Sequence, residues 1–418
     1  MIKKSKKPAI RFTGFTEAWE QRKLGDLGNF KSNGVDKLSK PDEIPVNLLN
    51  YMDVYKRRQL NNKMTSELMQ VTAKPNQLID NNVLKGDVFF TPTSETADDI
   101  GHCMAIEETL KNTVYSYHLM RYRPHEGSFY LTYPNYAFDT NEVRNKMALM
   151  AQGVQRFVLS KSQFESIEFS YTKLEEQKKI ADFLTKLDHL ITLHQRKCDK
   201  LQAIKKGLLA KMFPTNNENT PKIRFKSFTE AWEQRKLGDI ASIVGGGTPS
   251  TINDEYWGGS INWFSPVEIG GEIYVGSSQN KITKEGYNNC SAKLLPVGTI
   301  LFTSRASIGK TAILAEKSCT NQGFQSIVPN IDKLDSYFIY SRSDELKKYG
   351  EAMGSGSTFV EVSGKQMAEM ELMMPLTLEE QQVIGNLFKK LDNLITLHQR
   401  KCEKLKNIKK ALLEKMFI

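Results

Sequence analysis

Two stretches of this 418-residue chain each occur twice, and this duplication limits the possible folds more than any other feature. The residues FTEAWEQRKLGD at 15–26 recur unchanged at 228–239, and the IRF at 10–12 recurs at 223–225. A forty-residue segment at 174–213 recurs at 378–417 with 27 identities. A period of this kind indicates that one structural plan is used twice. The chain is therefore a short motif, a variable block and a long segment, followed by the same three parts again.

The long segments are predicted to be helices. Apolar residues recur at alternating spacings of four and three, which is a heptad seam, and no proline interrupts 174–213. Phe183, Leu190 and Ile204 are predicted to widen this stripe. Thr172 with Glu175, and Thr377 with Glu380, resemble capping boxes. At 1.5 Å per residue, forty residues form a rod of ~60 Å. The seam residues are Ile180, Leu184, Leu187, Ile191, Cys198, Leu201 and Leu208, with Ile384, Phe388, Leu391, Ile395, Cys402, Leu405 and Leu412 in the second copy.

Two such helices in one chain most simply pair with each other as an antiparallel coiled coil with pseudo-two-fold symmetry. Near-identical rods related in this way meet at their midpoints, so His194 and His398 are predicted to lie close together at the helix crossing. Two alternatives stay open. Each helix could bury its stripe on its own block, and both histidines could tilt toward solvent.

The two blocks are predicted to be of α/β type, which makes the whole chain an α+β protein. VLKGDVFFTPTS at 83–94 and LLPVGTILFTSRAS at 294–307 share a strand-like apolar core after a glycine turn. The segment PTNNENTPK at 214–222 is typical of a polar linker. The predicted parts are a motif at 1–26, a first block at 27–172, a helix at 173–213, a linker and second motif at 214–239, a second block at 240–376, and a helix at 377–418.

The charge distribution permits a polyanionic partner without requiring one. The net charge is +10, and the two long segments carry nine basic and five acidic groups each. The blocks are close to neutral, with 16 basic against 17 acidic groups in 27–172. No apolar run approaches the ~20 residues of a membrane span, and MIKKSKKPAIRF lacks the apolar region of a secretion signal. The five cysteines show no CxxC spacing, which favours a reducing, cytoplasmic setting without a structural metal site.

Motifs of catalysis are missing. The stretch 307–311 ends like a phosphate-binding P-loop, but Ser304 stands where that pattern needs its first glycine. The six histidines form no HExxH or other metal-ligand spacing, and no Ser-centred GxSxG turn follows a strand. The chain contains no Pro-Pro, so the Asp/Asn-Pro-Pro-aromatic loop of DNA amino-methyltransferases is absent. Glu175 and Glu176 are interpreted as acidic residues of a helix's first turn. The tested catalytic interpretations therefore mostly fail.

The repeated IRF…FTEAWEQRKLGD opening and the LEEQ start of each long helix resemble the specificity (S) subunit of bacterial type I restriction–modification enzymes. The layout is similar too, because that family has two target-recognition domains, each followed by a long helix. The second block resembles a common recognition-domain pattern through GGTPS at 246–250, YW at 256–257 and GSTF at 356–359. The first block looks like another type, with YMDVY at 51–55, DIGH at 99–102 and GVQRF at 153–157.

This resemblance implies a function. Each recognition domain would read one half of a split double-stranded DNA target, while the helices set the spacing and dock the methyltransferase subunits. Two modification subunits would carry S-adenosylmethionine and methylate adenine N6. Restriction subunits would use ATP and Mg for translocation and cleavage. The chain itself would be non-catalytic, which matches the missing motifs, and it would bind no cofactor and no membrane.

Residues that contact DNA are predicted from side-chain chemistry. Arg reads guanine, Asn or Gln reads adenine, and Lys, Arg, Ser or Thr can bind phosphate. Any single candidate could instead form a surface salt bridge or a turn. Arg156 and Arg305 are the strongest candidates because each interrupts an uncharged loop. The first-block candidates are Lys56, Arg57, Arg58, Thr93, Ser94, Arg121, Arg123, Gln155 and Arg156. The second-block candidates are Thr248, Ser250, Trp263, Ser304, Arg305, Lys310, Asn321, Gln322, Ser357 and Thr358.

Trp19 and Trp232 in the repeated opening are predicted to anchor packing against the helix ends. Two other functions remain open. A coiled-coil scaffold that binds only protein would not need two dissimilar blocks between near-identical connectors. A fused methyltransferase is disfavoured by its missing motif.

Overall fold

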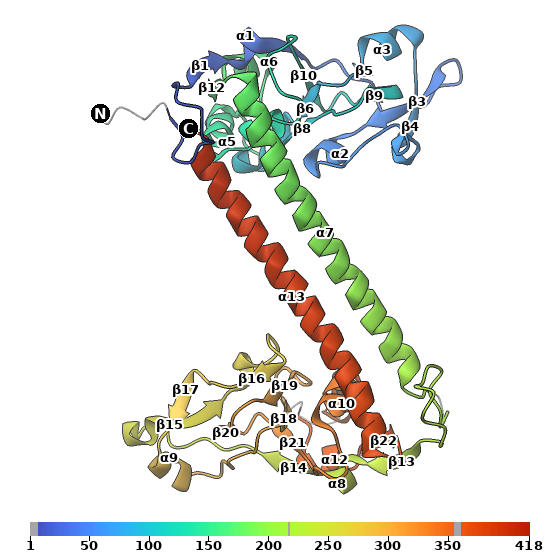
Figure 1. Cartoon of the computed structure of the whole chain (residues 1–418), viewed down its shortest axis with the longest axis vertical. Helices are drawn as coiled ribbons and strands as arrows, with labels where there is room; N and C mark the ends of the chain where they lie inside the picture. The colour runs from blue at the N-terminus through green and yellow to red at the C-terminus, as the bar shows by residue number, and fades with distance from the viewer. Residues whose placement is uncertain (1–6, 216–217, 355–360) are drawn as a thin grey trace. The chain divides into compact units, whose positions relative to one another are not determined.

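The computed structural model describes residues 7–215, 218–354 and 361–418, and these form two units (Figure 1). Unit 1 comprises Met1–Gln195 with Arg400–Ile418, and unit 2 comprises Arg196–Gln399. The two predicted long helices are present as α7 (Leu174–Met212) and α13 (Leu378–Met416). Each helix begins in the unit of its own block and ends in the other unit. Over the described residues, no helix combines the length and apolar character needed to cross a membrane.

Unit 1 contains two four-stranded sheets. The first is antiparallel, in the order β2-β10-β6-β8, and the second has the order β4-β3-β9-β5 with β3 parallel to β9. Short pairs join β1 to β12 and β7 to β11. The strands are β1 (Glu20–Lys23), β2 (Gly28–Lys31), β3 (Ile44–Leu49), β4 (Met69–Ala73), β5 (Asn82–Val83), β6 (Val88–Phe90), β7 (Thr93–Ser94), β8 (Cys103–Ala105), β9 (Leu110–Tyr115), β10 (Met120–Pro124), β11 (Phe157–Val158) and β12 (Glu168–Tyr171).

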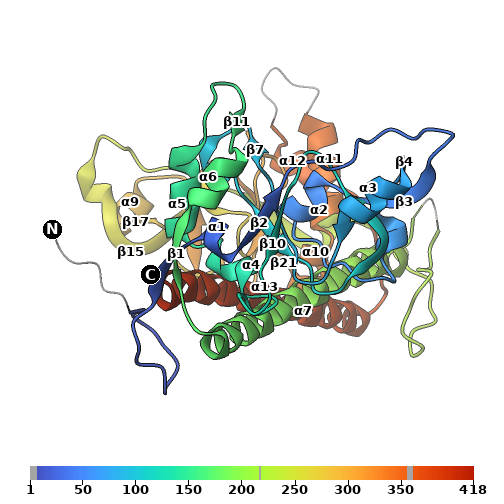
Figure 2. The ribbon, with the colours of Figure 1, turned by 90° about the horizontal axis from the view of Figure 1, so that it is seen from above.

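Short helices surround these sheets, and α6 lies beside α1, where Gly25 faces Glu165 (Figure 2). The short helices are α1 (Leu24–Leu27), α2 (Tyr51–Tyr55), α3 (Pro75–Asp80), α4 (Pro134–Ala137), α5 (Asn141–Met150) and α6 (Lys161–Ser166), with 3₁₀ turns at Thr65–Glu67 and Ala97–Asp99.

Unit 2 is built on the same plan. Its larger sheet has the order β14-β21-β18-β19-β16, a second sheet has the order β17-β15-β20, and β13 pairs with β22. Its strands are β13 (Glu233–Lys236), β14 (Ala241–Gly245), β15 (Trp257–Phe264), β16 (Tyr274–Val275), β17 (Asn280–Ile282), β18 (Ile300–Phe302), β19 (Thr311–Leu314), β20 (Ser318–Thr320), β21 (Gln325–Pro329) and β22 (Glu371–Met374). Its short helices are α8 (Leu237–Ile240), α9 (Lys284–Asn288), α10 (Ser336–Ser341), α11 (Ser343–Gly354) and α12 (Gly364–Ala368), with 3₁₀ turns at Asp254–Tyr256 and Pro266–Glu268.

The shared apolar segments of the two blocks are central strands, as predicted. All three residues of β6 and all three of β18 are buried, and each strand lies between two neighbours in its sheet. The glycine turn before each strand also matches, with Gly86 at φ +90° and Gly298 at φ +86°. Two blocks of little sequence similarity therefore share the core that carries their loops.

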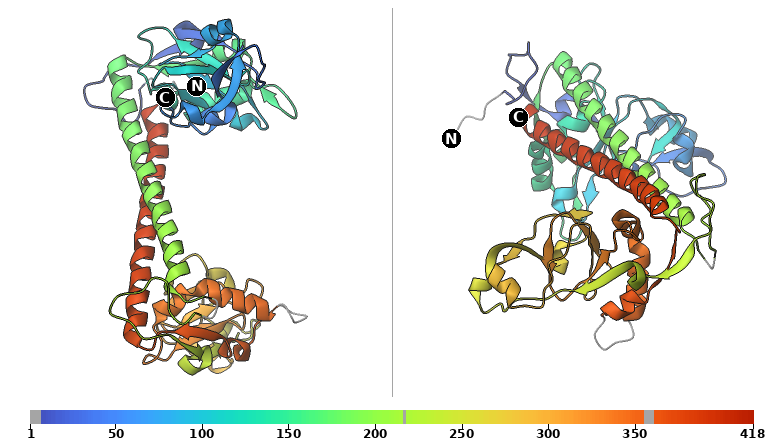
Figure 3. Two further views of the ribbon diagram at one scale, coloured as in Figure 1. Left: turned by 90° about the vertical axis from the view of Figure 1, so that its right-hand side faces the viewer. Right: turned by 60° about the horizontal axis from the view of Figure 1, so that its bottom comes forward.

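The long helices run antiparallel within each unit. In unit 1 the later part of α13 lies beside the earlier part of α7 (Figure 3). Asp188 pairs with Lys409, and Gln195 near the middle of α7 contacts Cys402. From Asp188 to Gln195 the chain advances seven residues along α7, while the partners Lys409 and Cys402 are seven residues apart in the reverse order along α13. This reversal shows that the two helices are antiparallel. In unit 2, Lys205 pairs with Asp392.

Both predicted uses of the apolar stripe occur together. Ile180 and Leu184 share one core with the first block and with Leu405 and Leu412 of α13. The widening of the seam is wrong for three residues, because Phe183, Leu190 and Ile204 are 38%, 45% and 40% exposed. They lie beside the seam, and Phe183 packs edge-on against Phe12 instead, with ring centroids 5.9 Å apart.

His194 belongs to unit 1 and His398 to unit 2. Their predicted approach at the helix crossing therefore stays a prediction.

The repeated opening motif docks on the start of the long helix through a buried carboxylate. Glu176 is fully buried and accepts hydrogen bonds from Arg11 Nε (2.6 Å), Arg11 Nη2 (2.8 Å) and Trp19 Nε1 (3.1 Å). Thr172 also donates to Glu176. The predicted capping box of Thr172 with Glu175 is therefore wrong, because Thr172 turns to the buried neighbour. Glu176 is a docking residue rather than a solvated first-turn carboxylate.

Unit 2 repeats this docking with equivalent residues. Glu380 accepts from Arg224 Nε (2.7 Å), Arg224 Nη2 (2.8 Å) and Trp232 Nε1 (3.2 Å). The ring of Trp232 packs edge-on against Phe213 at the end of α7, with centroids 6.0 Å apart. The predicted packing role of the tryptophans is confirmed in both units, since Trp19 meets Phe417 at the end of α13 in the same way.

Candidate nucleic-acid interface

A hydrogen-bonded threonine fixes the loop that follows the central strand of each block. In unit 2 the Thr303 amide donates to the Lys310 carbonyl, the Gly309 amide donates to the Thr303 carbonyl, and the Lys310 amide donates to Thr303 Oγ1, each at 3.0 Å. In unit 1, Thr91 makes the same three bonds with Gly101 and His102, at 2.9 to 3.0 Å. We call this arrangement the threonine clamp.

A glycine is required at the closing turn of each clamp. Gly101 has φ +78° and Gly309 has φ +92°, a region that favours glycine. Both also lie against a helix. A Cβ atom on Gly101 would stand 2.2 Å from Met147 Sδ of α5, and one on Gly309 would stand 2.3 Å from Lys347 Cγ of α11. The two clamps therefore share one hydrogen-bonded geometry but hold loops of different sequence.

The unit 1 clamp brings several predicted DNA-contacting residues together. Thr93 and Ser94 form β7, which pairs with β11 immediately after Gln155 and Arg156. The Arg156 Nη2 atom donates to Thr93 Oγ1 at 3.3 Å, and Gln155 and Arg156 are both exposed. Ser94 is buried and supports the loop from within.

A row of aromatic side chains continues this surface. The rings of Tyr51 and Tyr55 stack with centroids 6.0 Å apart, and His102 lies 4.6 Å from Tyr55. Asp99 joins them, since it accepts from the Tyr55 hydroxyl at 3.2 Å and lies 2.8 Å from His102 Nε2. The negative charge of Asp99 raises the pKa of Tyr55. These four residues were not among the predicted DNA-contacting residues, although they belong to the YMDVY and DIGH segments that resemble the family.

The second block gathers its predicted residues in a similar way. Thr248 hydrogen-bonds to Gln322, and the Asn321 side chain accepts from the Gly323 amide at 2.8 Å. Arg305 lies against Gly323 and forms a backbone bridge with Glu361.

Trp263 and Ser304 support this surface from inside. Trp263 is buried and its Nε1 donates to the Gly247 carbonyl at 2.8 Å, while Ser304 is fully buried. Ser250 accepts from Trp257 Nε1 through its carbonyl at 3.1 Å. Ser357 and Thr358 lie outside the described residues.

Other first-block candidates donate to groups inside their own domain. Arg123 forms a two-point ion pair with buried Asp87 at 2.6 and 2.8 Å, which raises the pKa of Arg123. Arg121 is buried, and burial lowers its pKa. Lys56 is exposed. The arginines with such internal contacts are Arg57, Arg58, Arg121 and Arg123.

Comparison with known proteins identifies the family. The model of the "Type I restriction modification DNA specificity domain" matches residues 16–203 and again 229–407. The chain belongs to this specificity family. Both matches run from an opening motif, through a block, into a long helix, so the family unit is the same duplicated plan.

Curated relatives carry the same family name. The chain is 37% identical over 190 residues to the type I restriction enzyme MjaIX specificity subunit of Methanocaldococcus jannaschii, covering 45% of this chain and 44% of that relative. It is 24% identical over 407 residues to the putative MjaX specificity subunit of the same organism, covering 95% and 92%. The crystal structure of a type I restriction–modification S subunit from M. genitalium has the same fold, with TM-score 0.64, 15% identity and 99% coverage of both chains.

The relatives are named as specificity subunits, which agrees with the prediction that this chain is a recognition subunit and not a catalytic subunit. The prediction of two α/β domains, each followed by a long helix, is also confirmed by the shared fold. Over residues 7–215, 218–354 and 361–418, no three His, Cys, Asp or Glu side chains gather in a way that could hold a metal ion.

Proposed function

We propose that this chain is the sequence-reading subunit of a type I restriction–modification complex, and that each block reads one half of a bipartite double-stranded DNA target. The observation that carries the proposal is the duplicated threonine clamp. Identical hydrogen bonds hold loops of different sequence, PTSETADD after Thr91 and SRAS after Thr303. A protein that reads two different half-sites needs this combination of one scaffold and two reading surfaces.

The chemistry of the loops suits base and backbone contact. Arg156 and Arg305 can donate two hydrogen bonds to guanine, and Gln155, Asn321 and Gln322 can pair with adenine. Tyrosine and threonine hydroxyls can contact phosphate oxygens. A scaffold that binds only protein would gain nothing from presenting such residues on matched clamps.

The partners follow from the same proposal. Two modification subunits would dock along α7 and α13 and supply S-adenosylmethionine for methylation of adenine N6. Restriction subunits would bring ATP and Mg for translocation and cleavage. The helices would also set the distance between the half-sites, since each connects the two units. The complex would work in the cytoplasm, where the host DNA lies.

Exchange of one block tests the assignment of blocks to half-sites. Residues 27–172 are replaced by the corresponding block of a relative, with both flanking repeats unchanged, and the chain is assembled with its modification subunits. Mapping of methylated adenines should show one half of the target changed and the other retained. If both halves changed together, each block would not read its own half, and loss of all site preference would reject the reading function itself.

A further inference from the structure

Resting on the DNA-reading role proposed above, we infer that the hollow between the unit 2 clamp loop and helix α11 binds one phosphate group of the DNA backbone. The hollow is lined by backbone and side chains of Ala306, Ser307, Gly309, Lys310, Lys347 and Glu351. Lys347 and Glu351 were not among the residues predicted from the sequence, because they belong to a helix that is distant along the chain.

Two lysines supply positive charge to this hollow. The stem of Lys310 lies against Gly270, where an added Cβ would meet Lys310 Cδ at 3.3 Å, and the residue is exposed. Within the described ranges of the chain, no carboxylate forms an ion pair with Lys310. Lys347 is half-exposed, and its Nζ lies 3.8 Å from Glu351 Oε1, which is long for an ion pair. The Lys310 ammonium is thus available to an anion, and the Lys347 ammonium is held only weakly by Glu351.

The backbone of the loop is turned so that it can add N–H donors. Ala306 has φ +60°, a left-handed conformation that a non-glycine residue rarely adopts. It is held there by the Ser307 amide, which donates to the Arg305 carbonyl at 2.7 Å, and by the Thr303 hydroxyl, which donates to the Ser307 carbonyl. The amides of Ala306 and Ile308 donate to no acceptor among the residues that the structure describes. These two amides lie on either side of the Ser307 amide, which is already used, and backbone N–H groups in a turn can bind an anion.

The corresponding loop of unit 1 is a natural contrast. Between Thr91 and His102 it carries the carboxylates Glu95, Asp98 and Asp99, and Met147 stands where unit 2 has Lys347. Acidic groups repel phosphate, whereas they can accept hydrogen bonds from the amino groups of cytosine or adenine. The same clamp thus carries a phosphate pocket in unit 2 and an acidic, aromatic surface in unit 1.

Salt dependence of DNA binding by the assembled methyltransferase tests the pocket. Each phosphate contact makes the slope of log K against log salt more negative by ~0.9. One contact therefore contributes roughly eightfold to the rise in affinity between about 1 M and 0.1 M salt. Lys310→Gln and Lys347→Gln should each reduce the magnitude of the slope by up to ~0.9. Both should weaken binding to specific and nonspecific DNA alike. The methylated sequence should stay the same. Lys348→Gln, which neutralises the exposed neighbour on another face of α11, is the matched control.

Glu351→Gln tests the same pocket in the opposite direction. Removing the carboxylate frees Lys347 and lowers the negative charge beside the phosphate, so DNA affinity should rise and the salt slope should steepen. A merely structural role for this residue would weaken binding or leave it unchanged.

DNA with single neutral methylphosphonates identifies the contact directly. One position near the half-site of unit 2 should weaken binding by the parent complex but not by the Lys310→Gln complex. The pocket would be rejected if Lys310→Gln and Lys347→Gln behaved like Lys348→Gln, or if they impaired subunit assembly while the salt slope stayed the same. A parent complex without any sequence preference would instead overturn the proposed function.

Discussion

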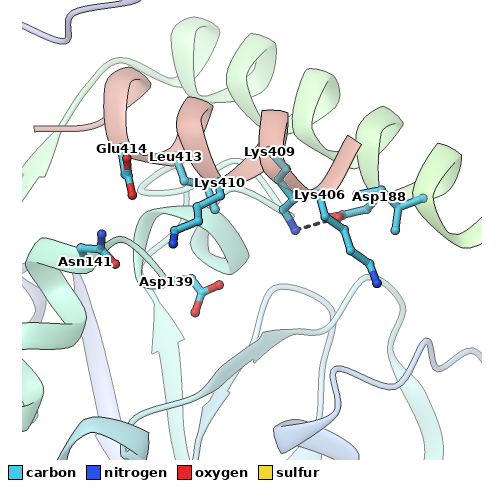
Figure 4. A pocket seen from close by; sticks show the side chains of 9 residues that line it. Asp139, Asn141, Asp188, Lys406, Lys409, Lys410, Leu413 and Glu414 are labelled. Atoms are coloured by element: carbon cyan, nitrogen blue, oxygen red, sulfur yellow. Dashed lines mark hydrogen bonds and ion pairs between the residues drawn. The ribbon is translucent and has the colours of Figure 1, made fainter. Parts of the chain in front are cut away.

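The Nζ atom of Lys409 lies 2.6 Å from the Oδ1 atom of Asp188, and this ion pair ties the end of α13 to the beginning of α7 in unit 1 (Figure 4). Unit 2 has the equivalent pair between Lys205 and Asp392, also at 2.6 Å. Two identical pairs at equivalent positions fix the register of the antiparallel helices in each unit.

Each aspartate also accepts a hydrogen bond from a tyrosine of its recognition domain. Tyr136 donates to Asp188 and Tyr337 donates to Asp392, both at 2.9 Å. The aspartate therefore joins three elements, and its negative charge helps to raise the pKa of Tyr337, although burial is the larger cause.

The two aspartates should differ in their contribution to stability. The Asp392 side chain is 9% exposed and the Asp188 side chain is 37% exposed. Loss of a partner costs ~3 kcal/mol or more for a buried pair and ~1 kcal/mol or less for a solvated one. Asp392→Asn should lower the urea midpoint clearly more than Asp188→Asn does. Equal shifts would mean that burial does not control the strength of these pairs.

The buried carboxylate under the opening motif should be essential for its docking. Glu176→Gln removes the charge that holds Arg11, while Glu175→Gln alters an exposed neighbour and serves as the control. We expect Glu176→Gln to cost ~3 kcal/mol and to make residues 10–26 sensitive to limited proteolysis. If both variants resisted cleavage like the parent chain, the motif would be held mainly by Trp19.

Arg156, which is exposed, and Arg305, which is partly exposed, should contact DNA. Arg156→Ala or Arg305→Ala should cost ~1–3 kcal/mol and relax one base position if the arginine reads guanine. If it binds phosphate, affinity should fall for all sequences and the salt slope should flatten. Methylation mapping and binding at several salt concentrations separate these outcomes. Unchanged affinity and slope would remove that arginine from the interface.

The duplicated fold was predictable from the sequence because repeats and heptads are local patterns. The helices, the strands β6 and β18, and the packing of Trp19 all follow from residue spacing and repetition. The buried state of Glu176 was not predictable in the same way. Its partner Arg11 lies 165 positions away, and in the sequence Glu176 looks like an ordinary acidic residue of a helix's first turn.

The candidate interface was predictable in part, for the same reason. Arg156 and Arg305 stand out because they interrupt uncharged loops. Arg123 has the same chemistry in the sequence, but its strand directs it onto Asp87, which is only 1% exposed. Which arginine faces outward depends on strand register and on distant carboxylates, and neither is visible in the spacing of residues.

The same backbone hydrogen bond joins the end of a long helix to the repeated IRF segment in both units. The Ile10 amide donates to the Lys415 carbonyl at 2.9 Å, and the Ile223 amide donates to the Lys211 carbonyl at the same distance. Eleven residues lie between Lys211 and Ile223, and twelve would lie between Lys415 and Ile10 if the termini were joined directly. A direct fusion of residue 418 to residue 1 should therefore give a connection of nearly the same length as the native linker.

A circular permutant tests this equivalence. The fused chain is opened within 214–222, which leaves both blocks, both helices and both docking motifs intact. Since loop-closure cost changes only slowly with length, the permutant should keep its stability within ~1 kcal/mol and direct methylation to the original target. A control permutant opened between β18 and β19 cuts the unit 2 threonine clamp and should lose one half-site. If the first permutant failed to fold while the parent chain folded, the joined termini would not be equivalent to the internal linker. The contact between Ile10 and Lys415 would then depend on a free terminus.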